Sequence, residues 1–288
     1  MSDARTITMA LGGKWYRRYG LAFCPAHNNT MTPALSVGTG REGQLLLNCK
    51  AGCDFADVAA ALRDRGLSEN DHKRTQHDHK AEQAANDLKR SQQAMGVAHG
   101  TIPIFGTIAE TYLRGRGITC PLPAGALRFH PACWHSSGKH LPAMVARVLG
   151  SDGYAVHRTY LKPDGSGKSD VEPAKAMLGN CAGGAVQLVG ADGSLVVCEG
   201  IETGLSLASG LLQRPATIWA AMSASGMGNL RLPPAPARLT IATDGDDAGR
   251  AAAHKLADRA HKLGWAVSFL HAQDGKDWND VLCEKDKK

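Results

Sequence analysis

The sequence predicts an α/β protein whose C-terminal third holds a parallel sheet, preceded by an α+β region and a small metal-binding domain at the N-terminus. Three observations support this fold class. Apolar runs alternate with helix-like segments over residues 191–288, the rhythm of a parallel sheet with right-handed crossovers. Two pairs of metal-binding residues lie within the first 67 residues. Between these regions, a strongly polar stretch lacks the apolar face that a core helix needs.

Composition narrows the class of protein. A chain of 288 residues, 43% of them apolar, can bury a substantial core in two or three compact units. No apolar run approaches the roughly 20 residues of a membrane span, and the N-terminus lacks a signal pattern, so we expect a cytoplasmic protein without a membrane partner. The uneven placing of eight cysteines favours one metal site over disulfides. A net charge of +6 suits an anionic partner such as nucleic acid, or simply a soluble basic surface.

The pattern of residues 1–67 predicts a small β-ribbon that is stabilised by a bound metal ion. Strands are expected at 32–37 and 44–48, and a helix at 54–65. Three thiols and one imidazole, spaced as on the two turns of a hairpin, are the candidate ligands: Cys24, His27, Cys49 and Cys53. This set fits one closed tetrahedral zinc site. In so small a domain, the metal would contribute much of the folding free energy.

Residues 68–99 are rich in charged side chains and helix formers, and they contain no proline. We expect a polar helical linker here, either a solvated helix or a mobile tether.

Residues 100–190 predict an α+β subdomain. A helix is expected at 107–116, ended by Gly117, and short strands should follow with hairpin turns at 151–153 and 164–165. Cationic side chains are concentrated in this region. The cationic residues that stand out are Arg158 and Lys175, followed by Lys168, Arg116 and Arg128, and each either contacts an anionic partner or is simply solvated surface.

Residues 191–288 predict the parallel sheet itself. The expected strands are 195–198, 217–222, 239–243 and 266–271, and the expected helices are 202–212 and 247–263. Acidic residues follow two of these strands and recur near the C-terminus: Glu199, Asp244, Asp246 and Asp277. The carboxyl ends of parallel strands gather at one edge, where such carboxylates repel each other unless divalent cations neutralise them. The pattern therefore predicts a site for Mg²⁺ or Mn²⁺, with Glu199 either ligating a metal or transferring a proton.

Other polar residues near this edge have simpler explanations. Asp247 and Glu202 are expected only to serve the first turns of their helices. Asp280 either supports a neighbouring metal ligand or caps a helix. The small residues of 223–228 either let the backbone approach a phosphate or form an ordinary connection.

Two sets of motifs resemble known families. Residues 23–27 and 32–37, with the Cys49 and Cys53 pair, resemble the zinc ribbon of bacterial and phage primases. That family usually separates its second cysteine pair by two residues, whereas three stand here, a form similar to the phage and plasmid branch. Residues 197–203 and 242–250 resemble the signature segments of the Toprim fold, shared by primases, topoisomerases and certain nucleases, and Asp277 resembles its third acidic motif.

The resemblance implies a DNA primase of phage or plasmid type. Such an enzyme would join nucleoside triphosphates into short RNA primers on single-stranded DNA, with Glu199, Asp244 and Asp246 as catalytic residues. The zinc ribbon would grip the template. Residues 100–190 would supply a basic ledge, where Arg158 and Lys175 first, then Lys168, Arg116 and Arg128, would contact the template–primer duplex and the triphosphates. A replicative helicase, if the protein has one as a partner, would be a separate chain. The alternatives are a Toprim nuclease and a non-catalytic replication factor that binds single-stranded DNA.

Overall fold

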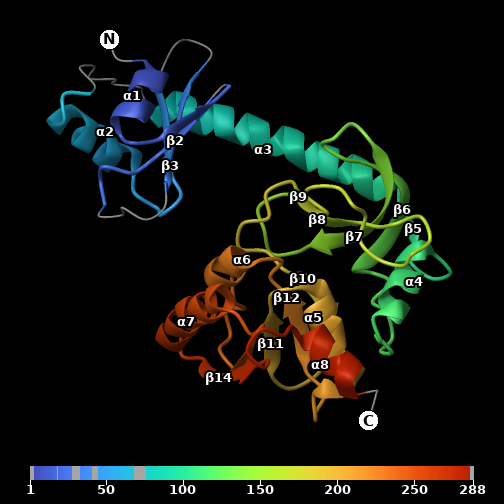
Figure 1. Ribbon diagram of the computed structural model, residues 1–288. Helices are drawn as coiled ribbons and strands as arrows, with labels where there is room; N and C mark the ends of the chain where they lie inside the picture. Colours follow the sequence, from blue (N-terminus) through green and yellow to red (C-terminus); the bar gives the residue numbers. More distant parts are fainter. Residues whose placement is uncertain (1–2, 18, 28–32, 41–44, 68–75, 286–288) are drawn as a thin grey trace. The chain divides into compact units, whose positions relative to one another are not determined.

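The computed structural model describes residues 3–17, 19–27, 33–40, 45–67 and 76–285. The chain forms two compact units, Met1–Gln76 and His77–Lys288, described in turn below as the N-terminal and C-terminal units (Figure 1). Within the described ranges, every helix is too short or too polar to cross a lipid bilayer.

The N-terminal unit is a four-stranded antiparallel sheet, in the order β1-β2-β3-β4, with two helices. Its elements are α1 (Ala4–Ala10), β1 (Lys14–Tyr16), β2 (Tyr19–Ala22), β3 (Leu35–Thr39), β4 (Leu45–Cys49) and α2 (Phe55–Asp64). The strands β3 and β4 and the helix α2 confirm the expected elements, although residues 32 and 44 lie outside the described ranges. The sequence pattern did not predict α1, which begins where the carboxylate of Asp3 accepts a hydrogen bond from the Thr6 amide at 2.7 Å.

The polar stretch forms the long helix α3 (Gln76–His99), and this helix is more than a linker. Ala94 is fully buried in a core with Val145 and Tyr160 of the following sheet. The Ser91 hydroxyl accepts a hydrogen bond from the Tyr154 amide at 2.8 Å. A few small side chains near its C-terminal end are therefore enough to dock a helix whose overall composition is polar.

An antiparallel sheet follows, with strand order β5-β6-β7-β8-β9. Its elements are β5 (Ile102–Pro103), α4 (Ile108–Gly115), β6 (Leu127–Trp134), β7 (His140–Val148), β8 (Ala155–Tyr160) and β9 (Lys175–Leu178). The helix α4 confirms the expected helix, since Thr107 precedes it and Gly117 takes a φ of 73° after its end. Gly153 turns between β7 and β8 with a φ of 88°, a conformation that glycine adopts without strain.

The last part of the chain contains the predicted parallel sheet. Its strand order is β10-β12-β11-β13-β14, parallel throughout except for β10, which pairs antiparallel with β12 at one edge. The strands are β10 (Val186–Val189), β11 (Leu195–Cys198), β12 (Thr217–Ala220), β13 (Arg238–Thr243) and β14 (Ala266–His271). The helices are α5 (Ile201–Ser206), which continues as a π-helical turn Leu207–Leu211, α6 (Ala224–Asn229), α7 (Asp247–Lys262) and α8 (Trp278–Lys285).

This arrangement confirms the predicted α/β class. All four expected strands and both expected helices are present. Three elements had not been predicted, namely β10, α6 and α8. Residues 224–229 are helical, and the Ser223 hydroxyl caps that helix by accepting from the Gly226 amide, so the expected loop is mostly a short helix.

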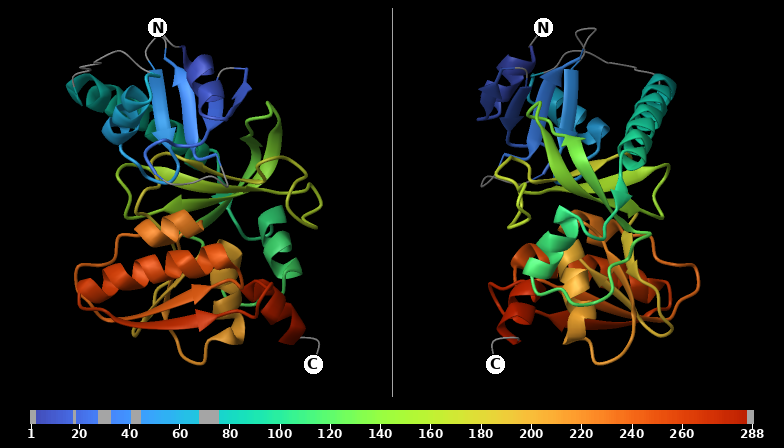
Figure 2. Two further views of the ribbon diagram at one scale, coloured as in Figure 1. Left: turned by 60° about the vertical axis from the view of Figure 1, so that its left-hand side comes forward. Right: turned by 90° about the vertical axis from the view of Figure 1, so that its right-hand side faces the viewer.

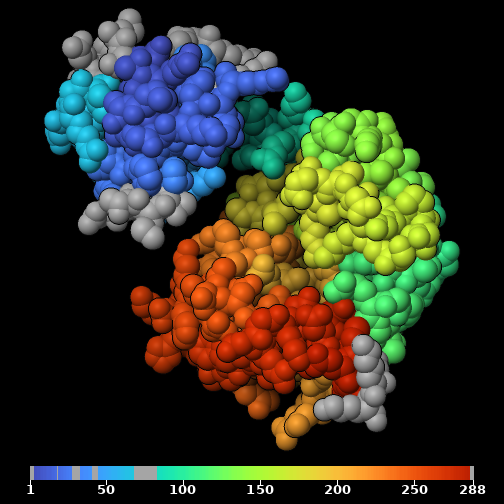
Figure 3. All heavy atoms as spheres, viewed as in Figure 1, coloured from blue at the N-terminus to red at the C-terminus, as the bar shows by residue number. Residues whose placement is uncertain are grey.

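Apolar side chains alternate between the two faces of the parallel sheet and give it two cores. On one face, Leu239 and Ile241 pack against α6 and α7; Figure 2 shows the orange helix α7 running beside the red strand β14. On the other face, Val196 and Cys198 share a core with α5 and α8. This second core also contains Met144 and neighbours from the antiparallel sheet. In Figure 3 the yellow and green atoms of that sheet accordingly lie against the orange and red atoms of the C-terminal layer.

Candidate functional site

Four side chains of the N-terminal unit converge as the sequence predicted. The ligand atoms of Cys24, His27, Cys49 and Cys53 all lie within 4.8 Å of one another. The His27 Nδ1 atom is 3.1 Å from the Cys53 Sγ and 3.7 Å from the Cys49 Sγ. Cys24 follows β2, Cys49 ends β4 and Cys53 precedes α2, so the sheet and the turn after it bring the two pairs together.

The chemistry of this cluster fits a cation. Burial and the nearby Cys49 and Cys24 thiols raise the pKa of Cys53 to about 11, because several thiolates at this spacing repel each other. A tetrahedral site with three sulfur ligands and one nitrogen ligand is a common structural zinc site, and zinc holds such thiols as thiolates. The four residues therefore form a cluster able to hold one metal ion.

Two carboxylates occupy the carboxyl edge of the parallel sheet. Glu199 directly follows β11 and Asp244 directly follows β13, and the pairing of Cys198 with Ala242 places both at the same edge. Burial and the charges of Asp244 and Asp246 raise the pKa of Glu199. Burial and the charge of Asp277 raise the pKa of Asp244. The acidic residues thus lie close enough to perturb one another, as like charges at one site do.

Asp246 and Asp247 both belong to the start of α7. The Asp246 carboxylate accepts a hydrogen bond from the Gly249 amide at 2.6 Å and caps the helix, with the Asp246 side chain exposed. Asp247 is the first residue of α7 and pairs with Arg250 at 2.9 Å, in agreement with the role expected of it. The sequence pattern had assigned a role at the start of this helix to Asp247 alone, whereas one oxygen of Asp246 also serves there, as the cap.

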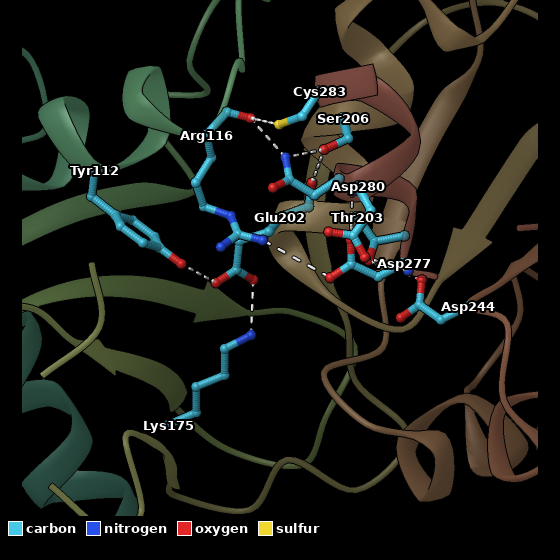
Figure 4. Close-up of polar contacts among 11 residues, drawn as sticks. Tyr112, Arg116, Lys175, Glu202, Thr203, Ser206, Asp244, Asp277, Asp280 and Cys283 are labelled. Atoms are coloured by element: carbon cyan, nitrogen blue, oxygen red, sulfur yellow. Dashed lines mark hydrogen bonds and ion pairs between the residues drawn. The ribbon is translucent and has the colours of Figure 1, made fainter. Parts of the chain in front are cut away.

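Asp277 and Asp280 fix the start of α8. The Asp280 amide donates to the Asp277 Oδ1 at 2.8 Å, while the Asp277 amide donates to the Asp280 Oδ2 at 3.1 Å. This reciprocal pair is a capping box. Of the two roles expected for Asp280, it favours that of a helix cap. The second oxygen of Asp277 faces the Arg116 guanidinium at 3.9 Å (Figure 4).

The acidic residues are less tightly grouped than the three cysteines and one histidine of the N-terminal unit. Among the described residues, only the cysteine and histidine cluster has all its ligand atoms within 4.8 Å. Oxygen donors are nevertheless the ligands that Mg²⁺ prefers, and two-metal sites spread their carboxylates around ions that are roughly 3.5–4 Å apart. A partly buried edge, on which burial and neighbouring acidic charges raise the pKa values of Glu199 and Asp244, fits the binding of divalent cations.

Glu202 differs most from expectation. It does not cap α5; instead it is buried, with 5% of its surface exposed. Its Oε1 accepts from the Tyr112 hydroxyl and its Oε2 from the Lys175 ammonium, each at 2.9 Å (Figure 4). Burial alone would raise the pKa of Glu202, but the charges of Lys175 and Lys168 lower it to about 2. The partners come from α4 and β9, too far along the chain for a local pattern to reveal.

Strand alternation separates the predicted cationic residues into two groups. Lys175 pairs with Thr159 across β8 and β9, so the two lie on the face that contacts the parallel-sheet layer. Lys168 lies near Lys175, whose charge, together with burial, lowers the pKa of Lys168. Arg116 joins this group through Asp277.

Arg158 and Arg128 belong to the opposite face, which packs against α3. Arg158 pairs with Ala176, is 7% exposed, and donates to the Trp134 carbonyl at 3.2 Å. Arg128 donates to the hydroxyl and the carbonyl of Thr101. The structure therefore brings Lys175, Lys168 and Arg116 to the carboxylate edge and leaves Arg158 and Arg128 away from it.

Comparison with known proteins gives two domain matches. Residues 88–188 match a domain of unknown function (DUF7146), and residues 194–288 match the Toprim domain. No curated protein matches the chain.

Several solved primase structures are similar to the chain. The zinc-binding and RNA polymerase domains of the Aquifex aeolicus primase are 14% identical over 97% of this chain and 79% of that one, with a TM-score of 0.41. The RNA polymerase domain of Mycobacterium tuberculosis primase DnaG is 18% identical over 69% and 79%, with a TM-score of 0.40. The primase fragment of the bacteriophage T7 primase-helicase is 16% identical over 50% and 63%, with a TM-score of 0.31. From the domain match, the parallel sheet and the acidic residues at its carboxyl edge, residues 194–288 are identified as a Toprim domain.

Proposed function

We propose that the protein is a DNA primase that makes short RNA primers on single-stranded DNA, in the replication of a phage or plasmid. The observation that carries this proposal is the presence, in one chain, of a Toprim domain and a cluster of three cysteines and one histidine. A Toprim nuclease has no evident need for the second feature, whereas a primase must both hold a template and join nucleotides.

In this proposal, divalent cations bind at the carboxylate edge. Glu199, Asp244, Asp246 and Asp277 would hold Mg²⁺ or Mn²⁺, using the oxygens left free by the helix caps. When bound, such ions neutralise the triphosphate and activate a 3′-hydroxyl for in-line attack on an α-phosphate.

The chain's own side chains orient these groups. The Thr203 hydroxyl lies 3.4 Å from the Asp244 Oδ1, and Arg116 faces Asp277. Lys175 and Lys168 supply positive charge for the triphosphate or the primer backbone from the facing sheet, the role proposed for the basic ledge.

The N-terminal unit would hold the template. Its cysteine and histidine cluster would carry one structural Zn²⁺ and keep the sheet folded, while the exposed and stacked rings of Tyr16 and Tyr19 offer a surface for bases. Lys14, whose ammonium lies 5.7 Å from the Tyr16 ring centroid, is available to a phosphate. A replicative helicase on a separate chain would be the further partner.

A primer-synthesis assay tests this proposal. The full chain is incubated with radiolabelled nucleoside triphosphates, a pool of single-stranded templates of all sequences, and Mg²⁺ or Mn²⁺. We expect labelled oligonucleotides from the wild type and none from Asp244→Ala, while both bind single-stranded DNA. Shortened templates without new product would instead indicate a nuclease. Binding without any reaction under either metal would indicate a non-catalytic replication factor.

A further inference from the structure

Glu202 lies where three distant parts of the chain meet. It stands in the first turn of α5, directly after the carboxyl edge of β11. Its two carboxylate oxygens are divided between α4, through Tyr112, and β9, through Lys175 (Figure 4). The separations along the chain are 90 and 27 residues, so this contact fixes tertiary geometry rather than local structure.

These contacts leave Glu202 no part in the reaction itself. Only 7% of its side chain is exposed, and both of its oxygens already accept short hydrogen bonds. It therefore cannot readily bind a substrate or a metal ion. Lys175 differs, because 36% of its side chain is exposed and its ammonium has further donors to offer.

The next residue connects the same turn to the acidic edge. Thr203 contacts Asp244 through its hydroxyl, while Glu202 contacts Lys175. One helical turn thus holds a cation on one side and a metal-binding carboxylate on the other. A buried ion pair contributes little net stability, so such a pair is better explained by the geometry that it fixes.

We propose that Glu202 is a positioning residue that holds the Lys175 ammonium beside the carboxylate edge, where Lys175 contacts the phosphates of a nucleoside triphosphate. The inference rests on the proposed function, in that it assigns a nucleotide to this site. It adds a residue that acts only through its neighbour. Tyr112 supports the same carboxylate from the opposite side.

Binding of ATP with magnesium to the full chain, measured by titration calorimetry, tests this role. Glu202→Gln keeps the shape of the side chain and removes its charge, and we expect it to weaken ATP binding about tenfold. Lys175→Gln should have a similar effect. The double variant should bind no more weakly than Lys175→Gln alone, because both changes remove the same contact. Tyr112→Phe removes one hydrogen bond and should weaken binding two- to threefold, roughly, since a single neutral donor contributes less.

Asp152→Asn is the matched control. It breaks the exposed ion pair between Asp152 and Arg231, which also joins the antiparallel sheet to the Toprim domain, with two contacts of 2.7 Å. We expect it to bind ATP as the wild type does. A folding defect would lower the number of binding sites in the titration, whereas a positioning defect changes the dissociation constant at full stoichiometry.

Three results would overturn the inference: wild-type affinity in Glu202→Gln, additive losses in the double variant, or no ATP binding by the wild type. Steady-state primer synthesis separates this inference from the proposed function. If ATP binding follows the expected pattern but no primer forms, the primase proposal fails alone. If primers form and the KM for ATP in Glu202→Gln equals that of the wild type, the positioning role fails alone.

Discussion

His157 lies in the middle of β8 with 4% of its surface exposed, on the strand face that also carries Thr159 and approaches Lys175. Its Nδ1 atom is buried and has no hydrogen-bond partner among the residues that the structure describes. Burial and the charge of Lys175 lower the pKa of His157 to about 4, because a positive charge here would lose its solvation and be repelled by Lys175 more than the charge of Glu202 attracts it.

This depressed pKa predicts a loss of stability in mild acid. The folded pKa of about 4 lies below the ordinary value of 6.5, so the unfolded chain binds the proton first as the pH falls. Above pH 6.5, His157 is neutral in both states and the free energy of unfolding is unaffected by it. Between pH 6.5 and pH 4, protonation of His157 in the unfolded chain lowers the free energy of unfolding progressively, by at most about 3 kcal/mol. In denaturant titrations, His157→Leu should therefore lose less stability than the wild type between pH 6.5 and 4.

A neighbouring variant provides the control. Thr159→Val changes a buried side chain on the same strand face without removing a titratable group, and it should keep the pH dependence of the wild type. Parallel stability curves for the wild type and His157→Leu would contradict the assignment.

At the scale of single elements, α3 shows how little apolar surface a helix needs to dock. Most of its described side chains are exposed, yet Ala94 is fully buried, and Val97 and Ala98 pack beside it. The position of Ala94 against Val145 and Tyr160 leaves no space for a longer or charged side chain.

Ala94→Glu should consequently lower the free energy of unfolding by at least about 2 kcal/mol, because it buries an unpaired carboxylate. The adjacent Gln93 is exposed, so Gln93→Glu introduces the same charge and should change that free energy by no more than about 0.5 kcal/mol. Urea titration of the two variants measures the difference. Equal effects would mean that α3 does not dock through Ala94.

Local patterns predicted the elements whose signals are local. The strands β11 and β14 were predicted to the residue, because each is a short run bounded by turn residues. The helices α1, α6 and α8 were missed because each spans eight residues or fewer, about two turns at most. The strand β10 was missed because only Val186 and Leu188 mark its buried face.

In the candidate site, too, local patterns predicted some features and missed those that depend on tertiary packing. Spacing alone indicated Cys24, His27, Cys49 and Cys53, whose ligand atoms converge. The partners of Glu202 depend on the packing of one layer on another, and the separation of Arg158 from Lys175 depends on strand register. Neither is encoded in a local motif.

For the whole molecule, the division into two units predicts two separable responses to metal removal. Chelation should remove the structural Zn²⁺ that we propose for the N-terminal cluster, and a small sheet depends on such a metal for its stability. Hydrogen exchange of the full chain in EDTA should therefore speed up by orders of magnitude in β3 and β4, with β13 and α7 unchanged. Cys53→Ser should behave like the chelated wild type, whereas Cys283→Ser, in the C-terminal unit, should not. If EDTA left hydrogen exchange in β3 and β4 as slow as it is without EDTA, the result would contradict a structural metal.

The parallel sheet of the Toprim domain begins earlier in the chain than the Toprim match, which starts at residue 194. Residues 186–188 lie in the upstream match, to the domain of unknown function, yet they are part of the edge strand β10 of the Toprim sheet. In that strand, Val186 pairs with Ala220 and Gln187 with Trp219. A fragment that starts at residue 194 would thus expose an open strand and the apolar surface now covered by Met144 and its neighbours. The two matched segments lie within one compact unit, so we expect a soluble fragment only when both are expressed together.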